Sequence, residues 1–239
     1  MSLRFIKPIL FLIFNSLIFI GCFWFSNYRY QQKNNLEVIV NYTNPPRFLN
    51  DSLVNKLLTQ NLPLKYCLRK DSLDLNILES KMNKIPEVKN VEIFVLPKGK
   101  LSLCITERKP LFKVDSDPPL YSDINGVLFN YKRLDSLRYP TFQTISSTIS
   151  LENSANMIKI LRADPFLSRE LDHVILIKDK YQLKLKSFDF NIIFGSPTRV
   201  KEKIKKLKVF CTFQNVQDSL NFFKKINLSY NNQVVATTS

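Results

Sequence analysis

The distribution of apolar and charged residues divides the chain into an apolar N-terminal segment and a longer remainder with mixed character. Residues from Pro8 to Tyr28 carry no formal charge, and most of them are large and apolar. A helix over this segment is roughly 30 Å long, which is enough to cross the hydrocarbon core of a bilayer once. No comparable run occurs later in the sequence. We therefore expect one membrane-spanning helix over residues 8–28.

Two other roles of the apolar segment compete with that of an uncleaved anchor. A cleaved secretory signal needs small residues at its cleavage site, but bulky aromatic residues follow the apolar core. Cys22 suggests a lipoprotein signal, but Phe19 is bulky and the apolar run continues past the cysteine. Trp24, Phe25 and Tyr28 instead fit an aromatic belt at the membrane interface. We therefore favour an uncleaved anchor.

The charges that flank the expected anchor decide its orientation only weakly. Arg4 and Lys7 precede it, whereas Arg29 and Lys33 follow it. The positive charges on the two sides are therefore nearly equal in number, and the positive-inside rule decides little. Because residues 1–7 are too few to fold, the simplest hypothesis makes them a cytoplasmic tail. Residues 29–35 then form a polar stalk, and the long C-terminal body lies on the other side of the membrane.

Residues 36–106 predict the element order β-α-α-β-β. Residues 36–40 indicate a strand, and apolar side chains recur at helical spacing over 48–58. A second helix is expected to begin near Ser72 or Asp74 and to end at Pro86. Residues 91–96 and 101–106 predict two strands joined by a turn. This order suits a small sheet with helices on one face.

Residues 107–236 predict a second, β-rich domain, so that the chain as a whole is α+β. Strands are expected over 111–114, 174–177, 181–186 and 191–194, with a hairpin over 120–129 that turns at Asn125-Gly126. A helix is expected over 153–161. Residues 226–230 alternate between apolar and polar side chains, which indicates a last strand. Residues 237–239 are left as a short tail.

A second helix of this domain is predicted to begin at Ser196, with Ser196 as N-cap and Pro197 in the first position. The apolar positions fall on one face of this helix: Val200, Ile204, Leu207 and Cys211. Basic side chains are expected on the opposite, solvated face: Arg199, Lys201, Lys203, Lys205, Lys206 and Lys208. An acidic partner or an anionic membrane surface remains an alternative role for that face.

Composition and charge narrow the function classes. The chain has a net charge of +15 with 45% hydrophobic residues, so a substantial core can form beneath a lysine-rich surface. Aromatic residues are largely missing among the lysines of 178–208, which argues against a nucleic-acid partner. Cys22, Cys67, Cys104 and Cys211 lack the spacing of a zinc site or a disulfide framework.

Motifs for chemistry are missing from the sequence. His173 is the only histidine, and there is no glycine-rich phosphate loop and no metalloprotease motif. No pair of carboxylates in the second domain suggests an acid and a base. We expect a protein that is not an enzyme and that holds no metal or cofactor.

Several segments together resemble the FtsQ/DivIB family of bacterial cell-division proteins. They are residues 85–91, Leu96-Pro97, the alternating positions 101, 103 and 105, Glu107-Arg108-Lys109-Pro110, and Asp123-x-x-Gly126-x-x-Phe129. The resemblance implies a cytoplasmic tail, one inner-membrane anchor, a POTRA domain over 36–106 and an FtsQ-type β-domain over 107–236. It also implies a non-catalytic periplasmic body that links other divisome proteins to septal peptidoglycan synthesis.

The same resemblance implies where partners bind. In these proteins the last strand offers its open edge to FtsB, which acts together with FtsL. The implied contact residues here are Leu228, Ser229, Tyr230, Gln233, Val234, Val235 and Lys178. Tyr230 matches an aromatic contact of the family, and Lys178 aligns with a basic residue that holds an acidic one, whereas Ser229 replaces a frequent arginine. An alternative function is that of a POTRA-based chaperone or export factor at the cell envelope, which predicts repeated POTRA units.

Overall fold

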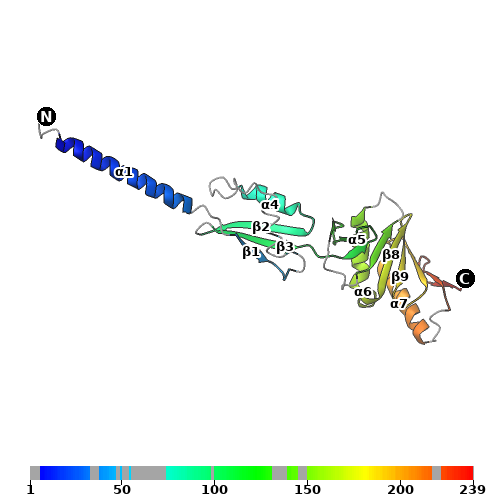
Figure 1. Cartoon of the computed structure of the whole chain (residues 1–239). Coiled ribbons are helices and arrows are strands. Elements are labelled where there is room, and N and C mark those ends of the chain that lie inside the picture. Colours follow the sequence, from blue (N-terminus) through cyan, green and yellow to red (C-terminus); the bar gives the residue numbers. More distant parts are fainter. Residues whose placement is uncertain are drawn as a thin grey trace. The chain divides into compact units, whose positions relative to one another are not determined.

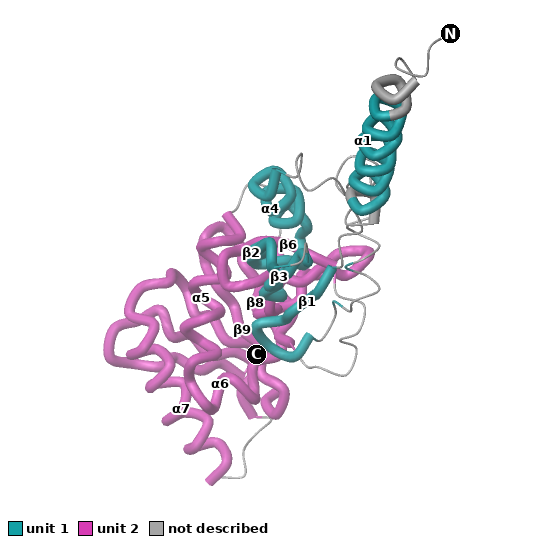
Figure 2. Tube along the Cα trace, turned by 90° about the vertical axis from the view of Figure 1, so that its left-hand side faces the viewer, with its two compact units in different colours: residues 1–107 teal, residues 108–239 magenta. Residues whose placement is uncertain are grey.

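The computed structural model describes residues 6–32, 38–46, 49, 54, 74–97, 100–130, 139–144, 150–216 and 222–238. The chain divides into two compact units, Met1–Glu107 and Arg108–Ser239, which are coloured teal and magenta in Figure 2. The predicted α+β class is confirmed, with an apolar N-terminal helix and a large β-sheet.

The first unit begins with the long helix α1, Ile6–Gln32. Its segment Phe11–Arg29 has a mean hydropathy of 1.5 and is not buried against the rest of the protein. Trp24, Phe25 and Tyr28 are all exposed on this helix. A helix that is apolar around its circumference and uncovered by protein is suited to a lipid environment.

A three-stranded sheet with the order β1-β3-β2 follows in the first unit. β1, Val38–Tyr42, lies parallel to β3, Lys100–Glu107, and β2, Val88–Leu96, pairs with β3 as an antiparallel hairpin. The predicted hairpin is therefore confirmed. The predicted helix over 48–58 lies mostly outside the described residues, but Leu49 and Val54 are buried.

Helix α4, Leu75–Asn83, runs beside β2 (Figure 1). It begins where the sequence predicts, because the Asp74 carboxylate accepts hydrogen bonds from the backbone N–H groups of Asn76 and Ile77. Its buried Leu78 and Met82 join the side chains of the sheet in one core. Beside these apolar side chains, Glu79 and Asn83 of α4 accept the N–H groups of Ile93 and Val91 of β2 at 2.7 and 2.9 Å. These bonds satisfy part of the edge of that strand.

The second unit is built on a nine-stranded sheet with the order β12-β11-β10-β9-β8-β7-β4-β5-β6. The strands are β4 Phe112–Val114, β5 Leu120–Ser122, β6 Leu128–Phe129, β7 Thr141–Thr144, β8 Leu171–Ile177, β9 Lys180–Leu185, β10 Asn191–Gly195, β11 Lys225–Asn227 and β12 Val235–Thr237. Neighbours pair antiparallel except β4 with β7, β7 with β8, and β10 with β11, which are parallel.

In the described part of this unit, three helices pack on the sheet: α5 Leu151–Ala163, α6 Pro165–Glu170 and α7 Val200–Val216. Ile158 of α5 and Leu207 of α7 share a core with the buried Leu183 and Ile192 of the sheet. The predicted apolar face of α7 is confirmed, because Val200, Ile204, Leu207 and Cys211 are all buried. Burial raises the pKa of the Cys211 thiol to about 12, so this thiol stays protonated at neutral pH.

The predicted start of α7 is wrong. The helix begins at Val200, and residues 196–199 form bends before it. Arg199 has a φ of 52°, in the left-handed region that a right-handed helix cannot continue through. The Ser196 hydroxyl bonds to the Thr198 hydroxyl and does not cap the helix.

Two motifs quoted for the resemblance meet in the second unit. Arg108 forms a buried ion pair with Asp123. Asp123 also accepts the backbone N–H groups of Asn125 and Val127, each at 2.9 Å, and so holds the turn of the β5–β6 hairpin. Gly126 is required in that turn because its φ is 79° and an added Cβ would lie 2.6 Å from the backbone of Glu152.

A candidate partner-binding edge

β12 is a terminal strand of the large sheet, and no strand among the described residues pairs with its outer side. It pairs with β11, so that Val235 lies opposite Asn227 and Thr237 opposite Lys225. The carbonyl of Thr237 accepts the N–H of Lys224 at 2.9 Å, so Thr237 directs its backbone groups toward β11. Neighbouring strand residues direct these groups to opposite sides. Ala236 therefore points its N–H and C=O away from β11, where a further strand can bond.

The prediction that residues 226–230 form the last strand, with an open edge, is wrong. β11 ends at Asn227 and is flanked on both sides, by β10 and by β12, so the free edge belongs to β12. The alternation of the sequence continues past Asn227 because Leu228 is fully buried and its N–H still bonds to the carbonyl of Ile193 at 2.9 Å. The chain then turns, because the side chain of Asn227 accepts the N–H of Ser229.

Residues 228–234, which we call the C-terminal loop, connect β11 to β12 and are held from two sides. Lys206 of α7 donates its Nζ to the carbonyl of Tyr230 at 3.0 Å. On the other side, an added Cβ at Gly195 would lie 2.5 Å from the Ser229 hydroxyl oxygen. The end of β10 therefore approaches the loop closely, and the glycine is required by this contact and by its φ of 76°.

The structure brings most of the predicted contact residues together around β12. Tyr230 is 49% exposed, and Ser229, Gln233 and Val235 are also exposed, whereas Val234 is half-buried. Leu228 differs from these residues because its side chain belongs to the core of the unit. Its side chain therefore positions the loop and does not face a partner.

Lys178 lies in the two-residue turn of the β8–β9 hairpin. It and Asp179 have φ values of 45° and 62°, as the turn of a tight hairpin requires, and Lys178 is exposed. Tyr181, at the start of β9, lies opposite Gly195, and Gly195 approaches Ser229. The strand register thus places Lys178 at the same end of the sheet as the C-terminal loop.

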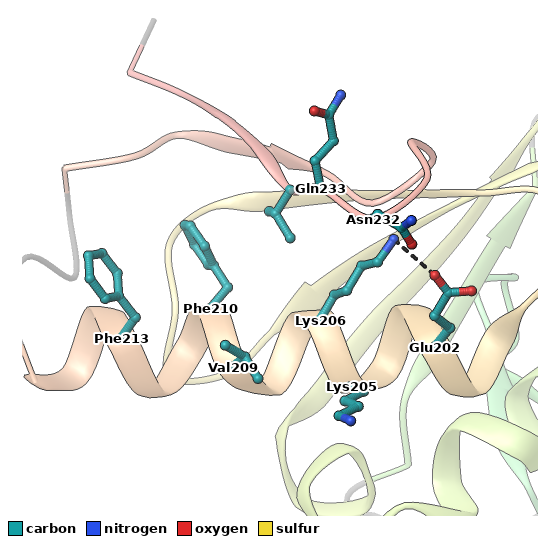
Figure 3. Close-up of a pocket in the computed structure, with 9 residues that line it drawn as sticks. Glu202, Lys205, Lys206, Val209, Phe210, Phe213, Asn232 and Gln233 are labelled. Carbon is teal, nitrogen blue, oxygen red and sulfur yellow. Dashed lines mark ion pairs between the residues drawn. The ribbon is translucent and has the colours of Figure 1, made fainter.

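A groove of about 560 Å³ runs between α7 and the C-terminal loop (Figure 3). Its residues from α7 are Glu202, Lys205, Lys206, Val209, Phe210 and Phe213, and those from the loop are Asn232, Gln233 and Val234. One end is charged, where Lys206 forms an ion pair with Glu202 at 3.4 Å. The other end is apolar. The groove was not predicted from the sequence, although the apolar residues that follow Lys208 on the helix could have indicated it.

Comparison with known proteins identifies the family of this chain. A family model described as FtsQ/DivIB, C-terminal related matches residues 109–237, more than half of the chain. The chain belongs to the FtsQ/DivIB family. No curated protein matches it. The matched region is nearly the whole second unit, including the edge at β12. Membership makes this protein a cell-division protein that interacts with other divisome proteins.

The apolar helix of this FtsQ/DivIB protein is consistent with its family. One helix among the described residues is long and apolar enough to cross a membrane, and it lies near the N-terminus. Together with the family, this helix indicates a membrane-anchored division protein. The exposed Trp24, Phe25 and Tyr28 lie near its C-terminal end, where an interfacial aromatic belt is expected.

The solvated basic face predicted for α7 of the FtsQ/DivIB protein is only partly confirmed. Arg199 lies before the helix, and Lys206 is half-buried against the C-terminal loop. Lys203 is only 2% exposed and does not belong to the solvated face. Its Nζ donates to the carbonyl of Ser196 at 2.7 Å and lies 5.0 Å from the centre of the Phe194 ring. Burial, followed by repulsion from Arg199 and Lys206, lowers the pKa of Lys203 below its ordinary value.

Ionisable groups elsewhere in the described residues form small local contacts. His173 Nδ1 lies 2.9 Å from Asp172 Oδ2 at the start of β8. No group of three or more His, Cys, Asp or Glu in the described part of the chain could hold a metal ion. In the described part of this unit, the unpaired side of β12 and the groove beside it are surfaces that another chain can contact.

Proposed function

We propose that this protein is a non-catalytic bitopic scaffold of the bacterial divisome. The short N-terminal tail lies in the cytoplasm and α1 crosses the inner membrane. The part of the first unit that follows α1 and the whole second unit lie in the periplasm. FtsB- and FtsL-type partners bind the second unit, which links them to septal peptidoglycan synthesis. The observation that carries this proposal is the open edge of β12 inside the segment that matches the FtsQ/DivIB family.

The first unit is proposed to be a POTRA-type module. Its described strands form a three-stranded sheet with β3 in the centre, and α4 packs beside β2. The predicted second helix of such a module falls on residues that lie largely outside the described ones. In this proposal the module contacts other membrane proteins of the divisome, whereas the second unit holds the FtsB/FtsL-type pair.

Binding at β12 is proposed to occur by strand addition. The outward backbone groups of Ala236 provide one donor and one acceptor to an incoming strand, and its neighbours provide side-chain contacts. Tyr230 supplies a half-exposed aromatic ring at the end of the loop, and Lys178 supplies a positive charge at the same end of the sheet. An acidic residue on the partner would complement that charge.

A proline substitution at the edge tests this mode of binding. Ala236→Pro removes the outward N–H, and we expect about a tenfold loss of affinity for the FtsB/FtsL-type pair, since one hydrogen bond contributes about 0.5–1.5 kcal/mol and the ring adds a clash. Ala236→Thr keeps the N–H and serves as the matched control. Affinity is measured with the full-length chain in detergent or nanodiscs, and thermal unfolding verifies that both variants fold.

Tyr230→Glu provides a second test that leaves the backbone of β12 unchanged. Placing a charge on the exposed aromatic position should also weaken binding, without altering the melting temperature, because the Tyr230 side chain is half outside the protein. If both Ala236→Pro and Tyr230→Glu bind the pair as tightly as the parent chain, strand addition at β12 is wrong.

A further inference from the structure

Helix α7 presents one face to solvent over its entire length, and this face is distinct from the edge of β12. Its residues are Lys201, Lys205, Lys208, Val209, Thr212, Phe213 and Val216, all of them exposed. At 3.6 residues per turn they fall on one side of the helix, opposite the buried Ile204, Leu207 and Cys211. We call this face the α7 stripe.

The α7 stripe is divided along the helix axis into a basic half and an apolar half. Lys201 and Lys205 lie in the first half, and neither takes part in an ion pair within the described residues. Val209, Phe213 and Val216 lie in the second half and are 64%, 48% and 80% exposed. Large apolar side chains at spacings of four and three residues are the anchors by which one helix recognises another.

We propose that the α7 stripe docks a helix of the division partner, with carboxylates at one end and large apolar side chains at the other. The carboxylates lie against Lys201 and Lys205, and the apolar side chains lie against Val209, Phe213 and Val216. The stripe extends over about 22 Å, or about four helical turns. This inference rests on the proposed function, since the docked helix belongs to the partner whose strand adds to β12.

The position of the stripe relative to the edge supports a single partner for both. Val209 and Phe213 belong to the stripe and also line the groove, and Val234 lines the groove from the side that leads into β12. Figure 3 shows Val209 and Phe213 on α7 below the strand-side residue Gln233. A partner whose strand bonds to Ala236 therefore reaches the stripe across an apolar surface.

The axial division of the stripe favours a protein helix over a bilayer surface as the occupant. A helix that lies on a membrane has an apolar face along its entire length and lysines along the flanks. On α7 the lysines and the apolar side chains share one face and follow one another along the axis. Laying this face on a bilayer would press Lys201 and Lys205 toward the acyl chains, whereas a helix with carboxylates in one half complements both halves.

Site-specific photo-crosslinking in living cells tests the proposal with the full-length chain. A photoreactive amino acid replaces Thr212, which is exposed within the stripe, and Lys184, which is exposed on β9, serves as the control position. Crosslinked peptides are identified by mass spectrometry. We expect Thr212 to crosslink to a helical segment of an FtsB- or FtsL-type protein that contains Asp or Glu, and Lys184 to give at least fivefold less product.

Charge reversal provides the second arm of this experiment. The double variant Lys201→Glu/Lys205→Glu should lower the Thr212 crosslink at least fivefold, whereas the matched double variant Lys180→Glu/Lys184→Glu, also at exposed lysines, should not. Three results would overturn the docked helix. They are a crosslink from position 212 to lipid alone, no crosslink from position 212, and a crosslink yield that charge reversal at Lys201 and Lys205 leaves unchanged.

The edge variant separates a failure of this inference from a failure of the proposed function. If Ala236→Pro weakens capture of the pair while the stripe variants leave both capture and crosslinking unchanged, the stripe proposal fails and strand addition stands. If Ala236→Pro has no effect while reversal at Lys201 and Lys205 abolishes the Thr212 crosslink, the helix docks but strand addition fails.

Discussion

At the scale of single residues, Asp164 shows how one carboxylate connects two helices. It is the N-cap of α6, where it accepts the N–H groups of Phe166 and Leu167, and it also pairs with Lys208 of α7 at 3.0 Å. Burial raises the pKa of Asp164, but the Lys208 bond and the two backbone bonds outweigh it, so that the pKa lies below the ordinary 3.8.

Two substitutions at Asp164 should separate the cap from the charge. Asp164→Ala removes both and is expected to cost about 1 kcal/mol of stability. Asp164→Asn keeps a good cap and should cost less than about 0.5 kcal/mol, because Lys208 is half exposed and such pairs are weak. Urea unfolding at pH 7 measures the loss of stability in both variants. If the two variants lose the same free energy of unfolding, the cap and the charge do not contribute separately.

The contribution of the Asp164 charge should depend on pH in a defined direction. Because the pKa is lower in the folded state than in the unfolded state, the ionised carboxylate stabilises the fold above pH 3.8, and this contribution is lost as the pH falls through the folded pKa. The difference in the free energy of unfolding between the parent chain and Asp164→Asn should therefore be constant near neutral pH. It should shrink toward zero below pH 3.8. If this difference instead grows as the pH falls, the pKa of Asp164 is not lowered by folding.

At the scale of secondary structure, local patterns predicted most elements because their buried positions repeat regularly. Leu183 and Leu185 alternate with polar residues on β9, and Ile204 and Leu207 keep a helical spacing on α7. The errors arose where a distant part of the chain decides. Lys203 is buried because its Nζ bonds to the Ser196 carbonyl and lies over the Phe194 ring. The spacing of apolar residues along the helix cannot predict these contacts.

The candidate site was predicted in part for the same reason. The resemblance placed it near Tyr230, but which strand is the edge depends on long-range pairing, in which β12 folds back on β11 beyond the C-terminal loop. Leu228 satisfies an alternating pattern although it lies outside the strand, because the core continues past the last paired residue. The groove forms where α7 and the loop come together, so the apolar residues after Lys208 indicate an exposed surface on the helix but not the opposing wall.

The contact between β10 and the C-terminal loop should control the position of the edge. Gly195→Ala places a Cβ against the Ser229 hydroxyl in a left-handed conformation, which costs about 1–2 kcal/mol, and should shift the loop. We expect weaker capture of the FtsB/FtsL-type pair, partly restored in Gly195→Ala/Ser229→Gly, where the opposing side chain is removed. Binding is measured by titration at a temperature where all variants remain folded.

Gly126→Ala is the matched control for this test. Gly126 also has a positive φ and also approaches other atoms closely, but those atoms belong to the start of α5 and not to the C-terminal loop. This variant should lose stability without changing the affinity of the folded protein for the pair. If it weakens binding as much as Gly195→Ala does, general destabilisation and not the loop explains the loss.

At the scale of the whole molecule, the proposed topology makes opposite predictions for the two ends of the chain. The segment before α1 is short and the flanking charges are nearly balanced, whereas the sheet of the first unit and the whole second unit follow α1. If the body lies in the periplasm, alkaline phosphatase fused after Ser239 should be active. Green fluorescent protein fused at the same position should be dark, because it does not fold when it is exported unfolded by the general secretory route. The reverse pattern would place the body in the cytoplasm and exclude periplasmic partners for β12.

Replacing the anchor should then separate localisation from binding. A chain in which a cleavable signal peptide replaces residues 1–32 should enter the periplasm as a soluble protein, because the segment removed is the described candidate span. It should bind the FtsB/FtsL-type pair with the affinity of the anchored chain if β12 alone determines recognition, yet complement a deletion strain poorly, since the anchor concentrates the scaffold at the membrane. Co-purification measures the first expectation, and cell length in the complemented strain measures the second. Full complementation by the soluble chain would show that the anchor contributes nothing beyond export.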